Sequence, residues 1–305
     1  MTTILPEKIK KGATIGFLAV SGDIKDYAKL EQAKVEFEKC GFNVVISQTA
    51  VTRKRYLCAD DITRANALNE FFKNPEIDAI IACRGGYGAI RILDKIDYEA
   101  IKQNPKFFGG YSDITALQLM IYKKTGLVTY NSPMAYSDFG CETTQYTIQS
   151  FFDVLTNGIN ELSIDCPHVF FNGASSGVLW GGNLSTIQSL CGLDFLPDKK
   201  FIFVAEDINE PVYKIDKMFT QLLNIPAFKN NLSAVVLGDF SGIDNERYFD
   251  EYFTELAQEL KIPFTGGLKF GHEKDKLTFP IGVNAIVDTN LGKIFMAMSQ
   301  QTVDK

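Results

Sequence analysis

Histidine and tryptophan are scarce in this chain of 305 residues, and their scarcity limits the chemistry it can perform. Only His168 and His272 are present, beside a single tryptophan, Trp180. Two histidines are too few for a histidine-rich metal centre. The six cysteines lack the CxxC spacing typical of zinc ligands and redox pairs. They are Cys40, Cys58, Cys83, Cys141, Cys166 and Cys191. We expect no metal, no cofactor, and free thiols in a reducing cytoplasm.

Long apolar runs and basic tracts are also missing. No segment approaches the roughly 18 apolar residues that a membrane-spanning helix needs. Residues 1–11 mix Glu and Lys without the apolar core of a signal peptide. The formal net charge of -6 and the pI of about 5.1 disfavour nucleic-acid binding, and Arg53-Lys54-Arg55 is the nearest approach to a basic cluster. We expect a cytoplasmic protein without a membrane or nucleic-acid partner.

The residues that are present describe an ordinary globular protein with alternating strands and helices. Hydrophobic residues make up 46% of the chain and charged residues 22%, and the length suits one large or two ordinary domains. In the first half, apolar strand-like runs are separated by amphipathic helical segments. The predicted strands are Ala13–Val20, Phe42–Ser47, Ala79–Cys83 and Phe107–Tyr111, and the predicted helices are Tyr27–Cys40, Asp61–Lys73 and Ile114–Thr125. This alternation predicts a parallel sheet with helices on both faces, which binds ligands beyond the carboxyl ends of its strands.

The pattern weakens after this first unit and then resumes. A polar stretch punctuated by Pro167 and Gly173 separates the two regular parts. We therefore expect an N-terminal domain over residues 1–158, a connector over 159–176 and a smaller C-terminal α/β domain over 177–305. The second domain should contain strands Gly177–Trp180, Phe201–Ala205 and Ala234–Leu237, helices Leu184–Leu190, Lys214–Leu223 and Glu246–Leu260, and a hairpin of Ala285–Asp288 with Lys293–Met298.

Ser112 stands where a predicted strand passes into a predicted helix. Such an elbow raises the serine hydroxyl above the sheet and fans the following backbone N–H groups out beside it. A serine at this place is also a preferred helix cap, and on this stretch alone that simpler reading prevails.

Two further residues would complete a nucleophilic site with Ser112. A serine nucleophile needs a base, and the base needs an acid that orients it. Glu206 ends the strand Phe201–Ala205, and His272 ends a glycine-containing loop. Asp207 and Glu210 compete with Glu206 for the acid role, and spacing does not separate them. His168 is a poorer base because it lies in the polar connector.

The glycine turn after the third predicted strand allows several interpretations. Gly86-Tyr87-Gly88-Ala89-Ile90-Arg91 is a broken dinucleotide fingerprint, because Arg91 replaces the third glycine. The turn is alternatively an amide-lined oxyanion donor beside Ser112, or a plain tight turn. Arg84 is placed to hold a substrate carboxylate or to pair with a local acid.

Five short motifs carry a family resemblance, and they follow one another in a set order. They are Arg84-Gly85-Gly86-Tyr87-Gly88, Gly110-Tyr111-Ser112-Asp113-Ile114-Thr115, Gly181-Gly182-Asn183-Leu184, Glu206-Asp207 with Glu210 and Ile215-Asp216, and Gly271-His272. From the first strand to Gly282 the chain resembles the LD-carboxypeptidase family, which includes the muramoyltetrapeptide carboxypeptidases and the microcin C self-immunity peptidases. The resemblance implies a flavodoxin-like N-terminal domain, a smaller C-terminal domain and a homodimer.

The same resemblance implies roles for individual residues. Ser112, Glu206 and His272 would form a Ser–Glu–His triad in the cleft between the domains. Asp113, Gly85 and Gly86 would supply oxyanion amides, and we add Arg84 and Asn183 as candidates for substrate binding.

The residues and the resemblance together leave three possible functions. The first is a cytoplasmic serine carboxypeptidase that releases terminal D-alanine from murein tetrapeptides, a small-peptide substrate, during peptidoglycan recycling. The second is the same triad acting on aminoacyl- or peptidyl-nucleotides. The third is a non-catalytic module that binds a nucleotide or a sugar.

Overall fold

The computed structural model describes residues 2–158, 161–165 and 167–297. Its first half is a doubly wound α/β unit. The elements of this half are β1 (Thr14–Leu18), α1 (Tyr27–Lys39), β2 (Asn43–Ile46), the 3-10 helix η1 (Gln48–Val51), α2 (Asp61–Lys73), β3 (Ala79–Ala82), the 3-10 helix η2 (Ala89–Lys95), α3 (Tyr98–Gln103), β4 (Phe107–Gly110), α4 (Ile114–Thr125), β5 (Thr129–Asn131), the π-helix η3 (Ala135–Phe139) and α5 (Gln145–Asn157).

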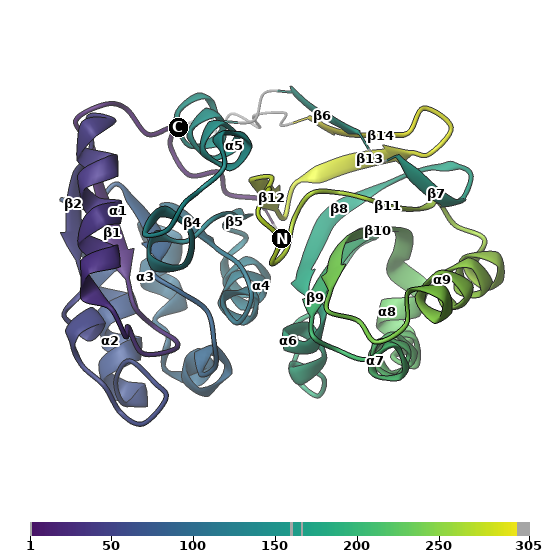
Figure 1. Ribbon diagram of the computed structural model, residues 1–305, viewed down its shortest axis with the longest axis horizontal. Coiled ribbons are helices and arrows are strands. Elements are labelled where there is room, and N and C mark those ends of the chain that lie inside the picture. The colour runs from purple at the N-terminus through teal and green to yellow at the C-terminus, as the bar shows by residue number, and fades with distance from the viewer. Residues whose placement is uncertain (1, 159–160, 166, 298–305) are drawn as a thin grey trace.

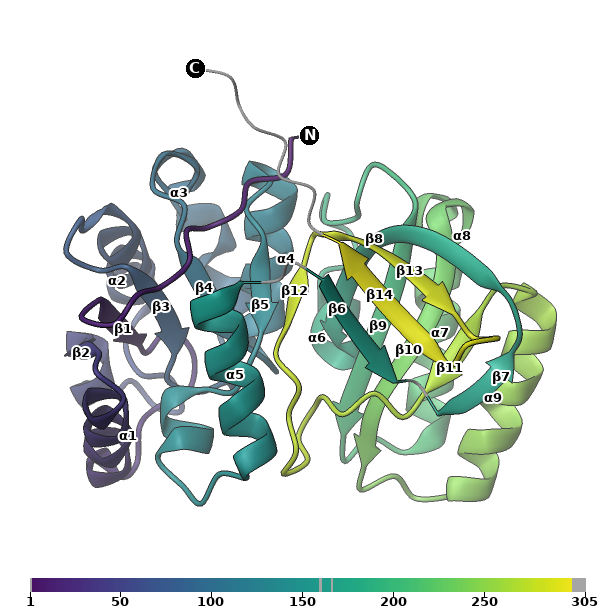
Figure 2. The same ribbon diagram turned by 90° about the horizontal axis from the view of Figure 1, so that it is seen from above.

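The first sheet has the strand order β12-β5-β4-β3-β1-β2 in the described part of the chain. Strands β1 to β5 pair in parallel, whereas β12 joins the edge in antiparallel register. Figure 2 shows α1 and α5 on one face of this sheet and α2, α3 and α4 on the other. Every residue of β3 and β4 is buried, as expected for strands covered on both faces. The expected parallel sheet with helices on both faces is confirmed, and its order is flavodoxin-like.

The second half is built around an eight-stranded mixed sheet of the described residues, in the order β6-β14-β13-β8-β9-β10-β11-β7. Its helices α6 to α9 lie together on one side of the sheet (Figure 1). The elements are β6 (Glu161–Asp165), β7 (His168–Phe171), β8 (Ala174–Asn183), α6 (Leu184–Ser189), β9 (Phe201–Ile208), α7 (Val212–Leu223), α8 (Pro226–Asn231), β10 (Leu232–Ser241), α9 (Glu246–Leu260), β11 (Phe264–Gly266), β12 (Phe279–Ile281), β13 (Asn284–Asp288) and β14 (Lys293–Ala297). The hairpin expected near the C-terminus is β13 with β14, and Met298 lies outside the described residues.

The stretch expected to connect the domains, residues 159–176, differs from that expectation. Its described part contains β6, β7 and the start of β8, so it belongs to the second sheet. β6 and β7 are the two outer strands of that sheet, and His168 and Val169 of β7 are exposed. Outer strands of a sheet can carry many polar residues, and for this reason their sequence resembles that of a linker. Residues 159, 160 and 166 lie outside the described part.

One segment of the second half crosses back to the first sheet. After β11 the chain runs to β12, which pairs with β5 through Phe279–Asn131 and Ile281–Thr129, and then returns as β13 to pair with β8. We call residues 272–281 the crossing segment. This segment links the two halves through the chain itself and through the hydrogen bonds of β12 with β5.

Helix α4 lies at this boundary and is buried on nearly all sides. Every residue from Ile114 to Tyr122 is buried, because the helix packs on its own sheet and also against β8 and α6. The N–H of Asn183 donates to the Thr115 hydroxyl at 3.2 Å, which ties β8 to the start of α4. Helix α4 is therefore held from both domains.

No helix in the described part of the chain is long and apolar enough to cross a membrane. Cys40, Cys58, Cys83, Cys141 and Cys191 are free thiols, and Cys166 lies outside the described residues.

Gly181, near the end of β8, lets this strand lie close to the backbone of β9. Gly181 has φ +143°, and an added Cβ would collide with the carbonyl of Val204 on β9. We predict that Gly181→Ala lowers the free energy of unfolding by about 2 to 4 kcal/mol. Gly192 is the matched control, because it has φ +103° with nothing within 4 Å of an added Cβ. Gly192→Ala should cost only the backbone strain, about 1 kcal/mol. Equal losses in urea unfolding would contradict the steric argument.

Candidate active site

Ser112 sits on a strained turn between β4 and α4. Its φ is +62°, a left-handed conformation that is unusual for a residue other than glycine. The turn is tight, because a Cβ added at Gly110 would lie 2.9 Å from Cγ2 of Ile114. A strained serine at a strand-to-helix turn is the geometry of a nucleophile elbow, and it differs from the ordinary extended backbone of a helix cap.

The side chain of Asp113 anchors this elbow to its neighbours. Its Oδ2 accepts hydrogen bonds from the Ser21 hydroxyl at 2.5 Å and from the Ala89 amide at 2.9 Å. Burial raises the pKa of the Asp113 carboxyl, and these hydrogen bonds oppose the rise. The carboxyl is thus occupied by Ser21 of the loop after β1 and by the first residue of η2, so any oxyanion role of Asp113 rests on its backbone amide.

The glycine turn after β3 lies directly against Ser112. A Cβ placed on Gly85 would be 2.9 Å from the Ser112 hydroxyl and 3.4 Å from the Asp113 amide nitrogen. Gly86 has φ +118°, which glycine adopts at little cost. The absence of a side chain at Gly85 lets backbone approach the serine, as the oxyanion interpretation of this turn requires, whereas Gly86 faces Gly22 and Arg84.

Glu206 and His272 are brought together from β9 and the start of the crossing segment. Oε2 of the fully buried Glu206 lies 2.9 Å from Nδ1 of His272. Gly271 has φ +129°, and a Cβ at that position would lie 2.9 Å from the same carboxylate oxygen. The preceding glycine therefore makes room for the carboxylate–imidazole contact, which resembles the orienting half of a catalytic triad.

The two competing acids face elsewhere. Asp207 accepts hydrogen bonds from the Asn183 amide at 3.0 Å and from the Ser185 backbone at 2.8 Å, so it holds the start of α6. Glu210 forms an ion pair with Lys214 at 3.2 Å. Of the three acids, Glu206 is the one in hydrogen-bond contact with His272.

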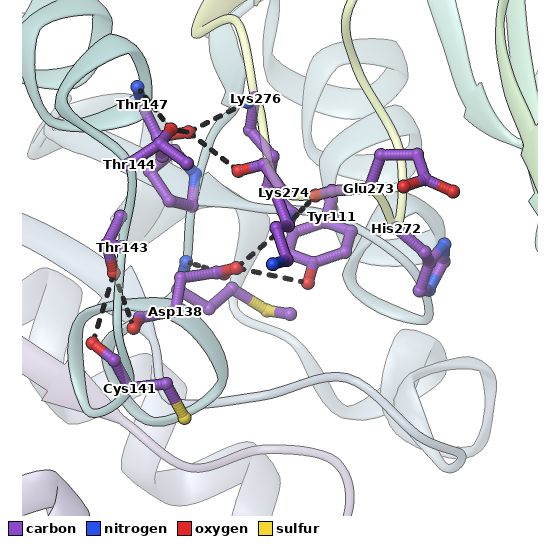
Figure 3. A network of polar contacts seen from close by, with 12 residues as sticks. Tyr111, Asp138, Cys141, Thr143, Thr144, Thr147, His272, Glu273, Lys274 and Lys276 are labelled. Atoms are coloured by element: carbon purple, nitrogen blue, oxygen red, sulfur yellow. Dashed lines mark hydrogen bonds and ion pairs between the residues drawn. The ribbon is translucent and has the colours of Figure 1, made fainter.

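His272 also contacts Tyr111, the residue before Ser112. The rings of Tyr111 and His272 meet edge to face, with centroids 5.1 Å apart. Figure 3 shows the imidazole beside the Tyr111 ring. His272 is thereby held between Glu206 of the second domain and the strand end that carries Ser112. Its Nδ1 faces the carboxylate, so Nε2 is the ring nitrogen that Glu206 does not engage.

The pKa of His272 lies above its ordinary value. Burial lowers it, but the hydrogen bond and charge of Glu206 and the charge of Asp207 raise it more. The charge of Lys276 acts in the opposite sense and lowers it. Glu206 is thus placed to stabilise the imidazolium that forms when His272 takes a proton.

The other residues that the sequence suggested, Arg84, Asn183 and His168, lie in different surroundings. Arg84 donates from Nη1 to the carbonyl of Asp23 at 2.9 Å, and its guanidinium lies 5.8 Å from the ring centre of Tyr136. Asn183 is buried and caps α6, where its Oδ1 accepts from the Thr186 amide at 3.1 Å. That capping occupies the side chain that we expected to bind substrate. His168 is exposed and stacks on Phe170, and its strand β7 is separated by β10 and β11 from β9, which carries Glu206.

Sequence reasoning missed two residues beside the site. Asp138 of η3 and Lys276 of the crossing segment form a buried ion pair, with Nζ 3.1 Å from Oδ1. Neither lies in a recognisable motif, and they are brought together only by the crossing of the chain. Among the described residues, no three His, Cys, Asp or Glu side chains are grouped so that they could hold a metal ion.

Comparison with known proteins identifies the family. Residues 15–132 match the LD-carboxypeptidase N-terminal domain, and residues 176–287 match the LD-carboxypeptidase C-terminal domain. A probable murein peptide carboxypeptidase of Bacillus subtilis is 30% identical, over 93% of this chain and 91% of the relative. The chain belongs to the LD-carboxypeptidase family.

Solved structures of the family share the whole fold. The crystal structure of a muramoyltetrapeptide carboxypeptidase from Oxalobacter formigenes superposes with a TM-score of 0.84 at 30% identity, covering 93% of this chain and 98% of that one. The microcin C7 self-immunity protein MccF in complex with aspartyl sulfamoyl adenosine superposes with a TM-score of 0.87 at 26% identity, covering 97% and 99%. The expected family is confirmed, and both of its named branches are represented among the similar structures.

The scarcity of histidine makes the Glu206–His272 contact directly measurable. We predict that Glu206→Gln lowers the pKa of His272, because the substitution removes the carboxylate charge that raises it. An NMR titration of the imidazole signals measures this, since only His168 contributes a second set. Glu210→Gln is the matched control and should leave the His272 titration unchanged. A shift with the control but none with Glu206→Gln would show that the acid was assigned to the wrong residue.

Proposed function

We propose that this LD-carboxypeptidase family member uses Ser112, His272 and Glu206 as a catalytic triad that releases terminal D-alanine from murein tetrapeptides. The observation that carries the proposal is the placement of His272, hydrogen-bonded to Glu206 and packed on the residue before Ser112. The similarity to murein peptide carboxypeptidases supports the substrate class. Location in the cytoplasm and assembly as a homodimer stay predictions of the sequence and its resemblance.

In the proposed reaction, Ser112 attacks the carbonyl of the peptide bond before the terminal D-alanine. His272 takes the hydroxyl proton through Nε2, while Glu206 keeps Nδ1–H oriented and stabilises the positive ring. The tetrahedral oxyanion would be held by backbone amides of Asp113 and of the Gly85-Gly86 turn. Collapse of the intermediate passes the proton from His272 to the leaving amine and leaves an acyl-enzyme.

Water completes the proposed cycle. His272, now neutral again, activates a water molecule that hydrolyses the ester on Ser112. Arg84 is our candidate for the terminal carboxylate of the substrate, because a guanidinium binds a carboxylate through two hydrogen bonds. Its position after β3 places it next to the glycine turn that contacts Ser112.

An aromatic pair beside the same turn favours a second candidate, the hydrolysis of aminoacyl-nucleotides. Tyr56 and Tyr87 are 54% and 46% exposed, and their ring centroids lie 5.8 Å apart. The guanidinium of Arg55 lies 5.7 Å from the ring centre of Tyr56. Exposed rings beside a cation suit a base with an anionic linker. Trp180 does not serve this purpose, because it is fully buried.

Mass spectrometry of two substrates tests the proposed reaction. We expect the wild-type protein to release D-alanine from a murein tetrapeptide, and Ser112→Ala to lower kcat by about 10⁴-fold or more. The variant should retain its fold, since it deletes one hydroxyl. Below the raised pKa of His272 the base is protonated, so kcat/KM should rise with pH through that pKa. Release of D-alanine that continues at the wild-type rate in Ser112→Ala would refute the proposed mechanism.

The second substrate separates the two candidates. An aminoacyl-sulfamoyl adenosine is incubated with the wild-type protein and with Tyr87→Ala. If the nucleotide is the better substrate, the loss of the ring should raise KM by about tenfold, the cost of one stacking contact. If the tetrapeptide is preferred and Tyr87→Ala leaves nucleotide turnover unchanged, the second candidate is excluded.

A further inference from the structure

The buried pair of Lys276 and Asp138 lies where the two domains meet beside His272. Lys276 is 7% exposed and Asp138 is 8% exposed. Nζ of Lys276 lies 3.1 Å from Oδ1 of Asp138, and it also donates to the carbonyl of Glu273. Lys276 belongs to the crossing segment and Asp138 to the first domain. The ion pair therefore spans the domain boundary within four residues of His272.

Tyr111 connects this pair to the proposed nucleophile. Its hydroxyl lies 3.5 Å from Oδ1 of Asp138, and Nζ of Lys276 lies 5.4 Å from the centre of its ring. The same ring and the His272 ring meet edge to face. Figure 3 shows the tyrosine between the ion pair and the imidazole. One side chain thus touches both charged groups and the proposed base, and it immediately precedes Ser112.

The backbone of the crossing segment is fastened at the same place. The Thr147 hydroxyl of α5 donates to the carbonyl of Lys274 at 3.0 Å and accepts from the amide of Lys276 at 2.8 Å. Farther along, the amide of Thr278 donates to the Ser150 hydroxyl at 2.8 Å. These bonds set the path of the segment along α5. The Lys276 side chain then reaches from that path to η3.

The energy of a buried ion pair indicates that this pair fixes the positions of its residues more than it stabilises the fold. Removing two charges from water costs about as much as their attraction returns, so a buried pair contributes little net stability. The pair can still fix the position of Lys276, because the Asp138 carboxylate is itself held by the Met134 amide, which donates to Oδ2 at 2.8 Å. Burial raises the pKa of Asp138, and the charge of Lys276 opposes that rise. A neutral partner at either position would lose this restraint.

We propose that Lys276 and Asp138 are a positioning pair, which holds the His272 loop of the second domain against the Tyr111–Ser112 elbow of the first. The proposal rests on the proposed catalytic role of His272. In this proposal, neither Lys276 nor Asp138 touches the substrate or the reacting atoms. Both act through the placement of the imidazole and through the charge that they present to it.

The charges of the pair act on His272 with opposite sign. Lys276 lowers the pKa of His272, whereas Asp138 and the imidazolium attract each other. The other titratable groups around His272 and Glu206 stay in place in the variants below. They are Glu206 and Asp207 of β9, Asp239 of β10, Tyr111 after β4 and Glu273 of the crossing segment.

Four variants test the positioning pair by NMR titration of His272 and by steady-state kinetics. We expect Lys276→Met to raise the pKa of His272, Asp138→Asn to lower it, and each to reduce kcat by about tenfold or more, with KM less affected. Lys276→Arg keeps the charge and should restore most of kcat. The double variant should lose no more than the worse single variant, because the two residues act as one unit.

Lys269→Met is the matched control. Lys269 lies in the same loop and forms an ion pair with Asp275 at 2.8 Å, but its side chain is 56% exposed. We expect wild-type kcat and an unchanged His272 titration for this variant. A folded Lys276→Met protein with wild-type kcat and an unchanged pKa of His272 would overturn the proposal.

The experiments separate a failure of the positioning proposal from a failure of the proposed function. If Ser112 is not the nucleophile, Ser112→Ala retains turnover whatever happens at Lys276. If Lys276→Met fails to fold, Asp138→Asn and Lys276→Arg still decide the proposal through the NMR titration, which needs no activity. Opposite pKa shifts in the two single variants support it, and shifts in the same direction refute it.

Discussion

The crossing segment is the constraint on which the site depends. Residues 272–281 leave the second sheet, run along α5 and add β12 to the first sheet before the chain returns. His272 begins this crossing, so its position is set by hydrogen bonds in both domains. The imidazole meets Glu206 on one side and Tyr111 on the other. A change in how the domains pack would therefore move the proposed base relative to Ser112.

The close packing of the two sheets follows from small residues and an unusually buried helix. Gly182 has positive φ and brings β8 against Thr115 of α4, whereas Gly181 does the same for the contact of β8 with Val204 within the second sheet. Helix α4 is buried on nearly all sides because it packs against elements of both domains. The same helix begins at the Ser112 elbow, whose strained backbone is held by the Asp113 carboxyl. Rigid packing at the boundary thus supports strain at the proposed nucleophile, which a looser interface would release.

Local patterns in the sequence predicted much of the fold, and long-range pairing limited the rest. Helices α2, α4 and α9 have the predicted bounds, because caps and apolar periodicity are local signals. Strands β6, β7 and β12 were missed, since short outer strands depend on partners far away in the chain. The sequence named Ser112, Glu206 and His272 but left Asp207 and Glu210 open. Strand alternation places Glu206 and Asp207 on opposite faces, and only the folded chain reveals which face meets His272.

A crystal structure of the wild-type protein tests the central claim most directly, through the distance between the Ser112 hydroxyl oxygen and Nε2 of His272. We predict that the two atoms lie within hydrogen-bond reach, at about 3 Å, with Glu206 still bonded to Nδ1. A serine hydroxyl turned into α4, with the imidazole directed away from it toward solvent, would contradict the account.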